Sequence, residues 1–265
     1  MDEELAFIDI HCHLLPGIDD GARDWDESLA MARIAVQDGI RCSVLTPHQL
    51  GQYSLTTGEE IRRLTAEFQT RLQEQGIRLA VRPGADVRID LDMIQRLASG
   101  DCVSLADRRK HVLLELPHEL YFPLEPVIAN LKKLGMVGIL SHPERNEGIL
   151  KRPELIPPLV EAGCLMQITA DSLTGVFGSA PKKMSEWMLQ NGLTHFIASD
   201  AHGTRRRKPL MRRSFERASE LVGEPYAKAI CCHNPLAVVN GQAVAKLPQV
   251  RRRGWMERIL KRQAA

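Results

Sequence analysis

The segment FIDIHCH (residues 7–13) is an apolar run that ends in two histidines two positions apart. It predicts a buried β-strand, in which side chains alternate between the two faces. On such a strand His11 and His13 share a face with Asp9. Two imidazoles at the end of a strand suit a borderline divalent metal, and Asp9 is placed to orient one of the rings. A His-x-His pair is also compatible with structural histidines, so further ligands must come from elsewhere in the chain.

Apolar runs and helical patterns alternate along the whole chain. The predicted strands are 6–10, 40–46, 77–87, 111–116, 136–141, 163–169 and 194–199. The predicted helices are 25–36, 58–75, 90–99, 123–134, 153–162, 181–191, 208–222 and 225–232. Strands that alternate with helices are typical of parallel βα units. Because the 265 residues contain no linker-like stretch, we expect a single α/β domain.

Composition and charge exclude several classes of protein. The net charge of +2 is too small to indicate a nucleic-acid partner. There is no apolar leader and no run of about 18 apolar residues, so neither secretion nor a membrane span is predicted. The six cysteines lack paired CxxC spacing, which predicts reduced thiols. We therefore expect a cytoplasmic protein.

Polar side chains suited to metal binding recur where the predicted strands end. They are His11, His13, His48, Asp86, Glu115, His142, Asp200 and His202. In a barrel of parallel strands the carboxyl ends meet at one rim, and active sites are built there. The recurrence along the chain therefore predicts a shared metal site at this rim.

Several short motifs surround these residues in a fixed order. They are DIHCH (9–13), IDDG (18–21), TPH (46–48), GAD (84–86), LEL (114–116), SHPER (141–145) and ASDAH (198–202). As an ordered set they resemble the PHP superfamily (polymerase and histidinol phosphatase), and within it the manganese-dependent tyrosine phosphatases of bacterial capsule and exopolysaccharide loci. The resemblance covers about residues 7 to 240. It implies a distorted (β/α)7 TIM-like barrel, assigned here to 1–245, with a metal centre at its rim.

The resemblance also implies a ligand set for three divalent metal ions per chain. The first ion would be bound by His11, His13, Asp86 and Asp200. The second would share Asp86 and add Glu115 and His142. The third would be bound by Asp20, His48 and His202. Mixed carboxylate and imidazole ligands suit manganese, with iron, zinc and magnesium as alternatives.

The bridging ligand departs from the family pattern. Members of the family commonly carry glutamate at this position, whereas this chain has Asp86. Aspartate is one methylene shorter than glutamate, so it can bridge two ions only if the backbone lies closer to them or if the spacing between the ions differs. The structural alternative is that Asp86 caps the turn that follows it.

Such a centre predicts hydrolysis of phosphoesters without a protein nucleophile. Divalent ions lower the pKa of bound water from about 15.7 towards 7, so we expect a metal-bridging hydroxide to attack phosphorus. Arg145 and Arg207 are candidates to stabilise the charge that develops on the phosphate oxygens. Because residues 205–207 are all arginines, the sequence leaves open which of them takes the second role. The alternative is that this run is a solvated basic loop with no contact to phosphate. His118 is placed to approach the substrate.

Other chemical signals in the chain are set aside. Cys102 and Arg108 have the spacing of a cysteine-dependent phosphatase loop. That loop lacks glycines and carries Asp107 where it would repel phosphate, so we attribute the spacing to chance. The histidines expected to be structural, because they open strands or helices, are His111, His195 and His233.

The C-terminal segment 246–265 is basic and amphipathic, and we treat it as a tail separate from the catalytic domain. A tail of this kind can lie on an anionic membrane surface or against a partner. Packing against its own domain, or simple solvation, is the alternative. Contact with a membrane would bring the protein close to a membrane-bound kinase.

These observations predict a metal-dependent protein-tyrosine-phosphatase. The resemblance implies that its substrate is a membrane-bound tyrosine autokinase that controls capsule or exopolysaccharide synthesis. A small-molecule phosphatase of the histidinol-phosphate type remains open, because the pocket around the metals sets the substrate. A third hypothesis is a non-catalytic barrel that acts as a binding module, which would carry degenerate metal sites.

Overall fold

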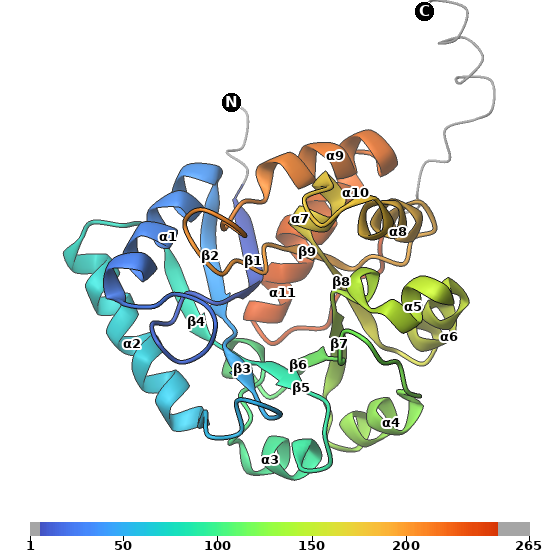
Figure 1. The fold of residues 1–265 in the computed structure, drawn as a ribbon, viewed down its shortest axis with the longest axis horizontal. Coiled ribbons are helices and arrows are strands. Elements are labelled where there is room, and N and C mark those ends of the chain that lie inside the picture. The colour runs from blue at the N-terminus through green and yellow to red at the C-terminus, as the bar shows by residue number, and fades with distance from the viewer. Residues whose placement is uncertain (1–5, 249–265) are drawn as a thin grey trace, which may run out of the picture.

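Parallel strands in two sheets form the centre of the computed structural model, which describes residues 6–248 (Figure 1). The first sheet has the order β1 (Phe7–Cys12), β2 (Ile40–Leu45) and β4 (Ala80–Pro83). The second sheet has the order β3 (His48–Gln49), β5 (Asp86–Arg88), β6 (His111–Glu115), β7 (Val137–Ser141), β8 (Leu165–Thr169) and β9 (Phe196–Ala198). All paired strands in both sheets are parallel. The carboxyl ends of these strands therefore point in one direction.

The two sheets are connected at both of their edges. On one side, β2 continues into β3 and β4 into β5, and the Asp86 amide donates to the Pro47 carbonyl at 3.1 Å across the break. On the other side, Cys12 forms a parallel bridge with Ala201, just after β9. The Asp200 amide donates to the His11 carbonyl at 2.7 Å beside this bridge. The strand ends of both sheets are thereby held next to one another.

Helices surround the strands on the outside (Figure 1). They are α1 (Trp25–Asp38), α2 (Gly58–Glu74), α3 (Met93–Ser99), α4 (Glu125–Lys133), α5 (Glu147–Lys151), α6 (Ile156–Glu161), α7 (Ala170–Thr174), α8 (Ser179–Gln190), α9 (Arg212–Val222), α10 (Glu224–Lys228) and α11 (Asn234–Val239). The sequence sets the bounds of α1 directly. Asp24 accepts a hydrogen bond from the Glu27 amide at its start, and Gly39 ends it with φ of 104°.

Apolar side chains fill two regions of the core. The larger cluster lies where the helices pack against the outer faces of the strands. The smaller cluster joins residues of β1, β2, β6, β7 and β9 with Val238 and Val239 of α11. In β1 this cluster takes Ile8 and Ile10, which precede the histidines. Packed apolar side chains therefore hold the strands in place just before their carboxyl ends. A functional site needs such rigid support to keep its side chains in a fixed geometry.

The predicted α/β architecture is confirmed, with differences in detail. The predicted strand 40–46 is found as β2, which ends at Leu45 before Pro47, a residue that cannot donate to a ladder. The predicted strand 77–87 is divided into β4 and β5 around Gly84, where an added Cβ would lie 2.6 Å from the Val44 side chain. The short helices α5, α7 and α11 were not predicted, since five or six residues give little periodicity. Helix α9 begins at Arg212 rather than at 208, after a loop.

Two predictions concern possible contact with a membrane. Between residues 6 and 248, none of the helices combines the length and the hydropathy needed to cross a bilayer. The predicted amphipathic tail 246–265 falls outside the described residues from position 249 onwards.

Candidate metal centre

Imidazole and carboxylate groups converge at the carboxyl ends of the strands. Their ligand atoms form four groups within which all atoms lie within 4.8 Å of one another. The groups are His13, Asp20, His48 and His202; His11, His142 and Asp200; His11, His13 and Asp86; and His48, Asp86 and Glu115. The structure therefore brings together all nine residues that the sequence singled out as metal ligands.

Backbone geometry explains why residues far apart in sequence meet here. In the β3–β5 pair His48 lies directly opposite Asp86, so the two side chains share one position along the sheet. His142 and Asp200, which follow β7 and β9, adopt left-handed φ values of 33° and 51°. This conformation is costly for residues other than glycine and is found at functional sites. Here it belongs to residues that carry their side chains into the centre.

Asp86 shows most directly that the cluster suits a cation. Its side chain is completely buried, and neither of its carboxylate oxygens has a hydrogen-bond partner among the described residues. One oxygen lies 3.5 Å from Nε2 of His11 and 3.6 Å from Nδ1 of His48. Burial, followed by the nearby Glu115 carboxylate, raises the pKa of Asp86. A buried carboxylate without partners is unfavourable, and coordination of cations would satisfy it.

The alternative role for Asp86, capping the following turn, is wrong. A cap would accept a hydrogen bond from a backbone amide, whereas both oxygens of Asp86 lack such a bond within residues 6–248. Asp86 instead opens β5, with its side chain among the imidazoles.

Partners behind the rings fix how His11 and His13 face the centre. Asp19 Oδ2 lies 2.7 Å from Nδ1 of His13, and Gln167 Oε1 lies 2.8 Å from Nδ1 of His11. Both rings therefore present Nε2 to the centre, where these atoms are 3.3 Å apart. Such partners set the tautomer and orientation of a ligating histidine.

The prediction that Asp9 orients one of these rings is wrong. The Asp9 carboxylate accepts hydrogen bonds from the Ser199 amide at 3.0 Å and from the Ser199 hydroxyl at 2.5 Å. It also accepts from the backbone amide of His11, not from its ring. The β1–β2 register shifts between Asp9 and Cys12, so simple alternation does not describe this strand. Asp9 ties β1 to the segment after β9.

The surroundings of His11 and His13 shift the pKa values of the two rings in opposite directions. Burial would lower the pKa of His13, but the Asp19 carboxylate raises it to about 10. Burial lowers the pKa of His11 to about 3, so this ring is neutral. A neutral imidazole is the form that binds metal, and Gln167 leaves its Nε2 available.

Two guanidinium groups lie at the edge of the centre. Arg145 Nη1 and Arg207 Nη2 lie 2.5 and 2.6 Å from Oδ2 of Asp200. Both guanidinium groups also stack over Phe177, at 4.4 and 5.9 Å from the ring centroid. Arg205 and Arg206 are exposed. Of the three arginines in the run 205–207, Arg207 is the one whose guanidinium pairs with Asp200.

A cavity of about 430 Å³ opens over the other side of the cluster. His118 lines it and stacks on His142 with ring centroids 5.4 Å apart. Sequence reasoning missed two further residues of its wall. Tyr53 stacks on His48 with centroids 5.2 Å apart, and Arg88 Nη1 lies 3.4 Å from Oε2 of Glu115. Tyr53 lies in a loop away from any predicted strand, whereas Arg88 directly follows the predicted strand 77–87, so the strand-end signal could have found Arg88 but not Tyr53.

The structure gives independent reasons to set aside the cysteine-dependent alternative. Cys102 is buried, and burial raises the pKa of its thiol to about 12, away from a reactive thiolate. Arg108 Nε donates instead to the Val239 carbonyl at 3.1 Å. His111 and His195 open or precede strands, and burial lowers the pKa of each to about 4.

The fold and this cluster define an α/β protein whose imidazole and carboxylate groups, at the ends of parallel strands, could hold metal ions. The chain belongs to the CpsB/CapC family, described as capsular polysaccharide synthesis, whose model matches residues 7–240. It is 40% identical over 202 residues to the tyrosine-protein phosphatase YwqE of Bacillus subtilis, covering 76% of this chain and 79% of that protein. It is 26% identical over 242 residues to the tyrosine-protein phosphatase CpsB of Streptococcus pneumoniae, covering 89% of this chain and all of the relative.

A solved structure agrees with these sequence comparisons. It comes from the crystal structures of YwqE and CpsB, described as unique metal-dependent tyrosine phosphatases. It matches with a TM-score of 0.85 at 33% identity, and the match covers 93% of this chain and 100% of the other. The family resemblance drawn from the ordered motifs is thereby confirmed.

Proposed function

We propose that this protein is a metal-dependent phosphomonoesterase that hydrolyses phosphotyrosine on proteins. The observation that carries the proposal is Asp86, a fully buried carboxylate without hydrogen-bond partners among imidazoles. Two guanidinium groups beside this cluster supply recognition of phosphate. Relatives named tyrosine-protein phosphatases favour this function over the histidinol-phosphate alternative. The non-catalytic alternative is disfavoured because every predicted ligand position carries a donor.

We propose three cations, with manganese as the first candidate. The donor groups support the predicted set of Asp20, His48 and His202, and they add His13 to it. They place His142 beside His11 and Asp200, and Glu115 beside His48 and Asp86. The predicted second ion, which combines Glu115 with His142, is the least supported of the three.

Different groups of the site would carry out different parts of the reaction. Bound divalent cations would supply Lewis acidity towards phosphate and activation of water. Arg145 and Arg207 present N–H donors next to Asp200, where phosphate oxygens can accept them. Tyr53 offers an aromatic face on the cavity wall. The leaving phenol has an ordinary pKa near 10, so it departs with less need for a proton than an alkoxide does.

His118 is a candidate to donate a hydrogen bond to the leaving oxygen. It lines the cavity, and burial followed by the Arg145 charge lowers the pKa of its ring. A neutral ring carries one N–H that can donate to a departing oxygen. Such a hydrogen bond can stabilise the departing phenolate, which leaves without needing full protonation.

The proposed physiological substrate is a membrane-bound tyrosine kinase of capsule or exopolysaccharide synthesis. The family description and the names of the relatives support this choice. We place the protein in the cytoplasm, in keeping with six free cysteine thiols. The basic tail 246–265 would assist through weak contact with the membrane surface.

We also propose that the two sheets together constitute the distorted (β/α)7 barrel expected from the resemblance, within a catalytic domain of 1–245. The continuity of β2 with β3 and of β4 with β5 leaves seven strand positions around the ring. The bridge between Cys12 and Ala201 would close it. Such closure places all the donors on one rim.

Substrate competition tests the proposed function. The manganese-loaded protein is assayed with a phosphotyrosyl peptide, the matching phosphoseryl peptide and histidinol phosphate, and kcat/KM is compared. We expect the phosphotyrosyl peptide to be preferred by at least about tenfold over each of the others. A preference for histidinol phosphate would reverse the choice of substrate, and absence of turnover with all three would overturn the proposal.

A further inference from the structure

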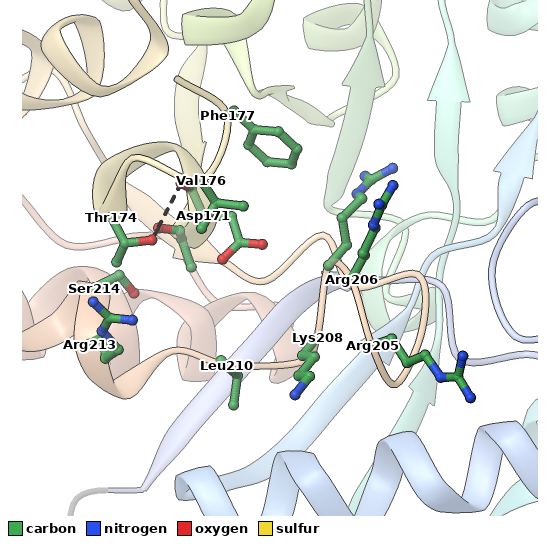
Figure 2. A pocket seen from close by; sticks show the side chains of 12 residues that line it. Asp171, Thr174, Val176, Phe177, Arg205, Arg206, Lys208, Leu210, Arg213 and Ser214 are labelled. Carbon is green, nitrogen blue, oxygen red and sulfur yellow. Dashed lines mark hydrogen bonds between the residues drawn. The ribbon is translucent and has the colours of Figure 1, made fainter. Parts of the chain in front are cut away.

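A second cavity, of about 640 Å³, adjoins the metal centre. Figure 2 shows α7 and the turn after it on one side, with Asp171 and Phe177, and the loop 205–208 on the other. Arg207 belongs to both sites, because it lines this cavity while its guanidinium reaches Asp200 in the centre. Phe177 likewise borders the cavity and stacks under that guanidinium. The cavity is therefore continuous with the place proposed for the phosphate.

Positive charge dominates the lining of this cavity. Four arginines and a lysine line the cavity together with a single carboxylate, Asp171; the basic residues are Arg205, Arg206, Arg207, Lys208 and Arg213. Burial raises the pKa of Asp171, while Arg207 and Arg213 act in the opposite direction. One half-buried carboxylate cannot neutralise this set, so the cavity attracts anions.

Among the described residues, three exposed cations of the cavity form no close ion pair. Within residues 6–248, Arg206, Lys208 and Arg213 form no ion pair with a carboxylate oxygen within 4.0 Å. Elsewhere on α9, by contrast, Arg217 pairs with Glu186 at 2.7 Å. Charges left without partners beside a binding site are available to a ligand.

We propose that Arg206, Lys208 and Arg213, termed here the basic flank, bind an anionic side chain of the substrate polypeptide close to the phosphotyrosine. The anion is a carboxylate or a second phosphate, which share the same recognition chemistry. Because one arginine side chain spans the two sites and an extended chain advances about 3.3 Å per residue, this group lies within about three residues of the phosphotyrosine. The proposal rests on the proposed function and names its preferred substrate class, acidic phosphotyrosyl peptides.

The apolar edge of the cavity favours a polypeptide ligand. Val176 is 64% exposed and lies in the cavity lining next to Phe177. These side chains can cover the backbone and apolar groups of a peptide whose anionic group reaches the basic flank. The net charge of the whole chain is only +2, so the attraction is local to this cavity.

The test compares peptides that differ only in flanking charge. A phosphotyrosyl peptide with glutamine at positions up to three residues on either side is the neutral reference. Glutamate, or a second phosphotyrosine, replaces each glutamine in turn. The value of kcat/KM is measured for the parent, for the double variant Arg206→Gln/Arg213→Gln, and for the control Lys132→Gln on α4. The small substrate p-nitrophenyl phosphate reports basal turnover, and thermal unfolding confirms that each variant is folded.

At one or more positions we expect an anionic residue to raise kcat/KM of the parent by about fivefold to tenfold at low salt. The preference should fall to about twofold or less in the double variant and persist in Lys132→Gln. It should also weaken at 0.5 M salt, because exposed charges are screened. Turnover of p-nitrophenyl phosphate should be the same in all three proteins.

Equal turnover of anionic and neutral peptides by the parent would overturn the basic flank while leaving the proposed function intact. A preference that survives in the double variant would overturn it as well. If no phosphotyrosyl substrate is hydrolysed, the proposed function fails first. Fluorescence anisotropy with the labelled acidic peptide then tests the basic flank by itself: weaker binding to the double variant than to Lys132→Gln supports it, and equal binding contradicts it.

Discussion

Asp19 Oδ2 lies 2.7 Å from Nδ1 of His13, and this contact turns Nε2 of the same ring towards Asp200, 3.5 Å away. The carboxylate thereby decides which nitrogen of His13 is free to bind a metal. It also accepts from the backbone amide of His48 at 3.1 Å, so it links two of the proposed ligands.

Replacing Asp19 should therefore weaken metal binding without removing a ligand. We expect Asp19→Asn to lower the affinity for manganese by about 10- to 100-fold, the usual effect of losing a carboxylate behind a ligating histidine. Calorimetric titration of the metal-free protein with manganese measures this. The exposed Asp26→Asn on α1 makes the same chemical change away from the site, and affinities equal in the two variants would contradict the assignment.

Asp86→Asn should separate metal binding from folding. The amide removes a buried carboxylate that lacks partners, so the metal-free variant should unfold at a temperature no lower than that of the parent. Ligand at 100 times its dissociation constant stabilises a protein by about 2.7 kcal/mol, and the variant should lose most of this gain. Thermal unfolding with chelator and with manganese measures both effects.

The control for this change is Asp92→Asn, which alters an exposed carboxylate before α3. It should retain the full stabilisation by manganese. A manganese-induced rise in unfolding temperature that is as large in Asp86→Asn as in this control would show that Asp86 does not bind the metal.

Arg145 should act on turnover more than on metal affinity. Its guanidinium is placed to stabilise charge on the transferred phosphate, and loss of one such donor costs about 100- to 1,000-fold in kcat. We expect Arg145→Gln to lower kcat for a phosphotyrosyl peptide within this range. The exposed Arg63→Gln on α2 should leave kcat unchanged. A kcat for Arg145→Gln within twofold of that control would exclude the proposed role.

His195 should make stability depend on pH. Burial lowers its pKa to about 4 in the folded protein, from an ordinary value of 6.5. Between these values the unfolded state binds more protons, so the free energy of unfolding falls as pH decreases from about 6.5 to 4, by up to about 1.4 kcal/mol per pH unit. Above this window His195 contributes no pH dependence.

Urea unfolding of the parent, His195→Gln and the exposed His233→Gln at pH 7, 6, 5 and 4.5 checks this expectation. The slope of unfolding free energy against pH should be smaller in His195→Gln than in the other two proteins. Three parallel curves would mean that the pKa of His195 is the same in the folded and the unfolded protein, which would contradict the expectation.

The convergence of ligands was predictable because parallel strands bring their carboxyl ends to one edge, whatever their separation in sequence. His48 and Asp86, for example, were both found from the ends of apolar runs, and the structure pairs them directly. The grouping of His142 with His11 and Asp200 was not predictable. It depends on left-handed φ values at His142 and Asp200, which periodicity does not reveal.

Sequence patterns do not predict most of the residues that contact the proposed metal ligands. Alternation along a strand predicts that Asp9 supports a histidine ring, but its bond to Ser199 arises from contact between β1 and the segment after β9. Gln167 lies within a predicted strand, and only the arrangement of β8 beside the centre gives it a role. Arg207 is distinguished from its basic neighbours by a φ of 47° and by Phe177, both properties of tertiary structure.

The most direct measurement of the central claim is phosphotyrosyl-peptide turnover before and after removal of metal, with the metal content of each sample determined. The claim predicts that turnover disappears with the metal, returns when manganese is added, and is unchanged in Cys102→Ser. Turnover that persists in metal-free protein and is abolished in Cys102→Ser would contradict it.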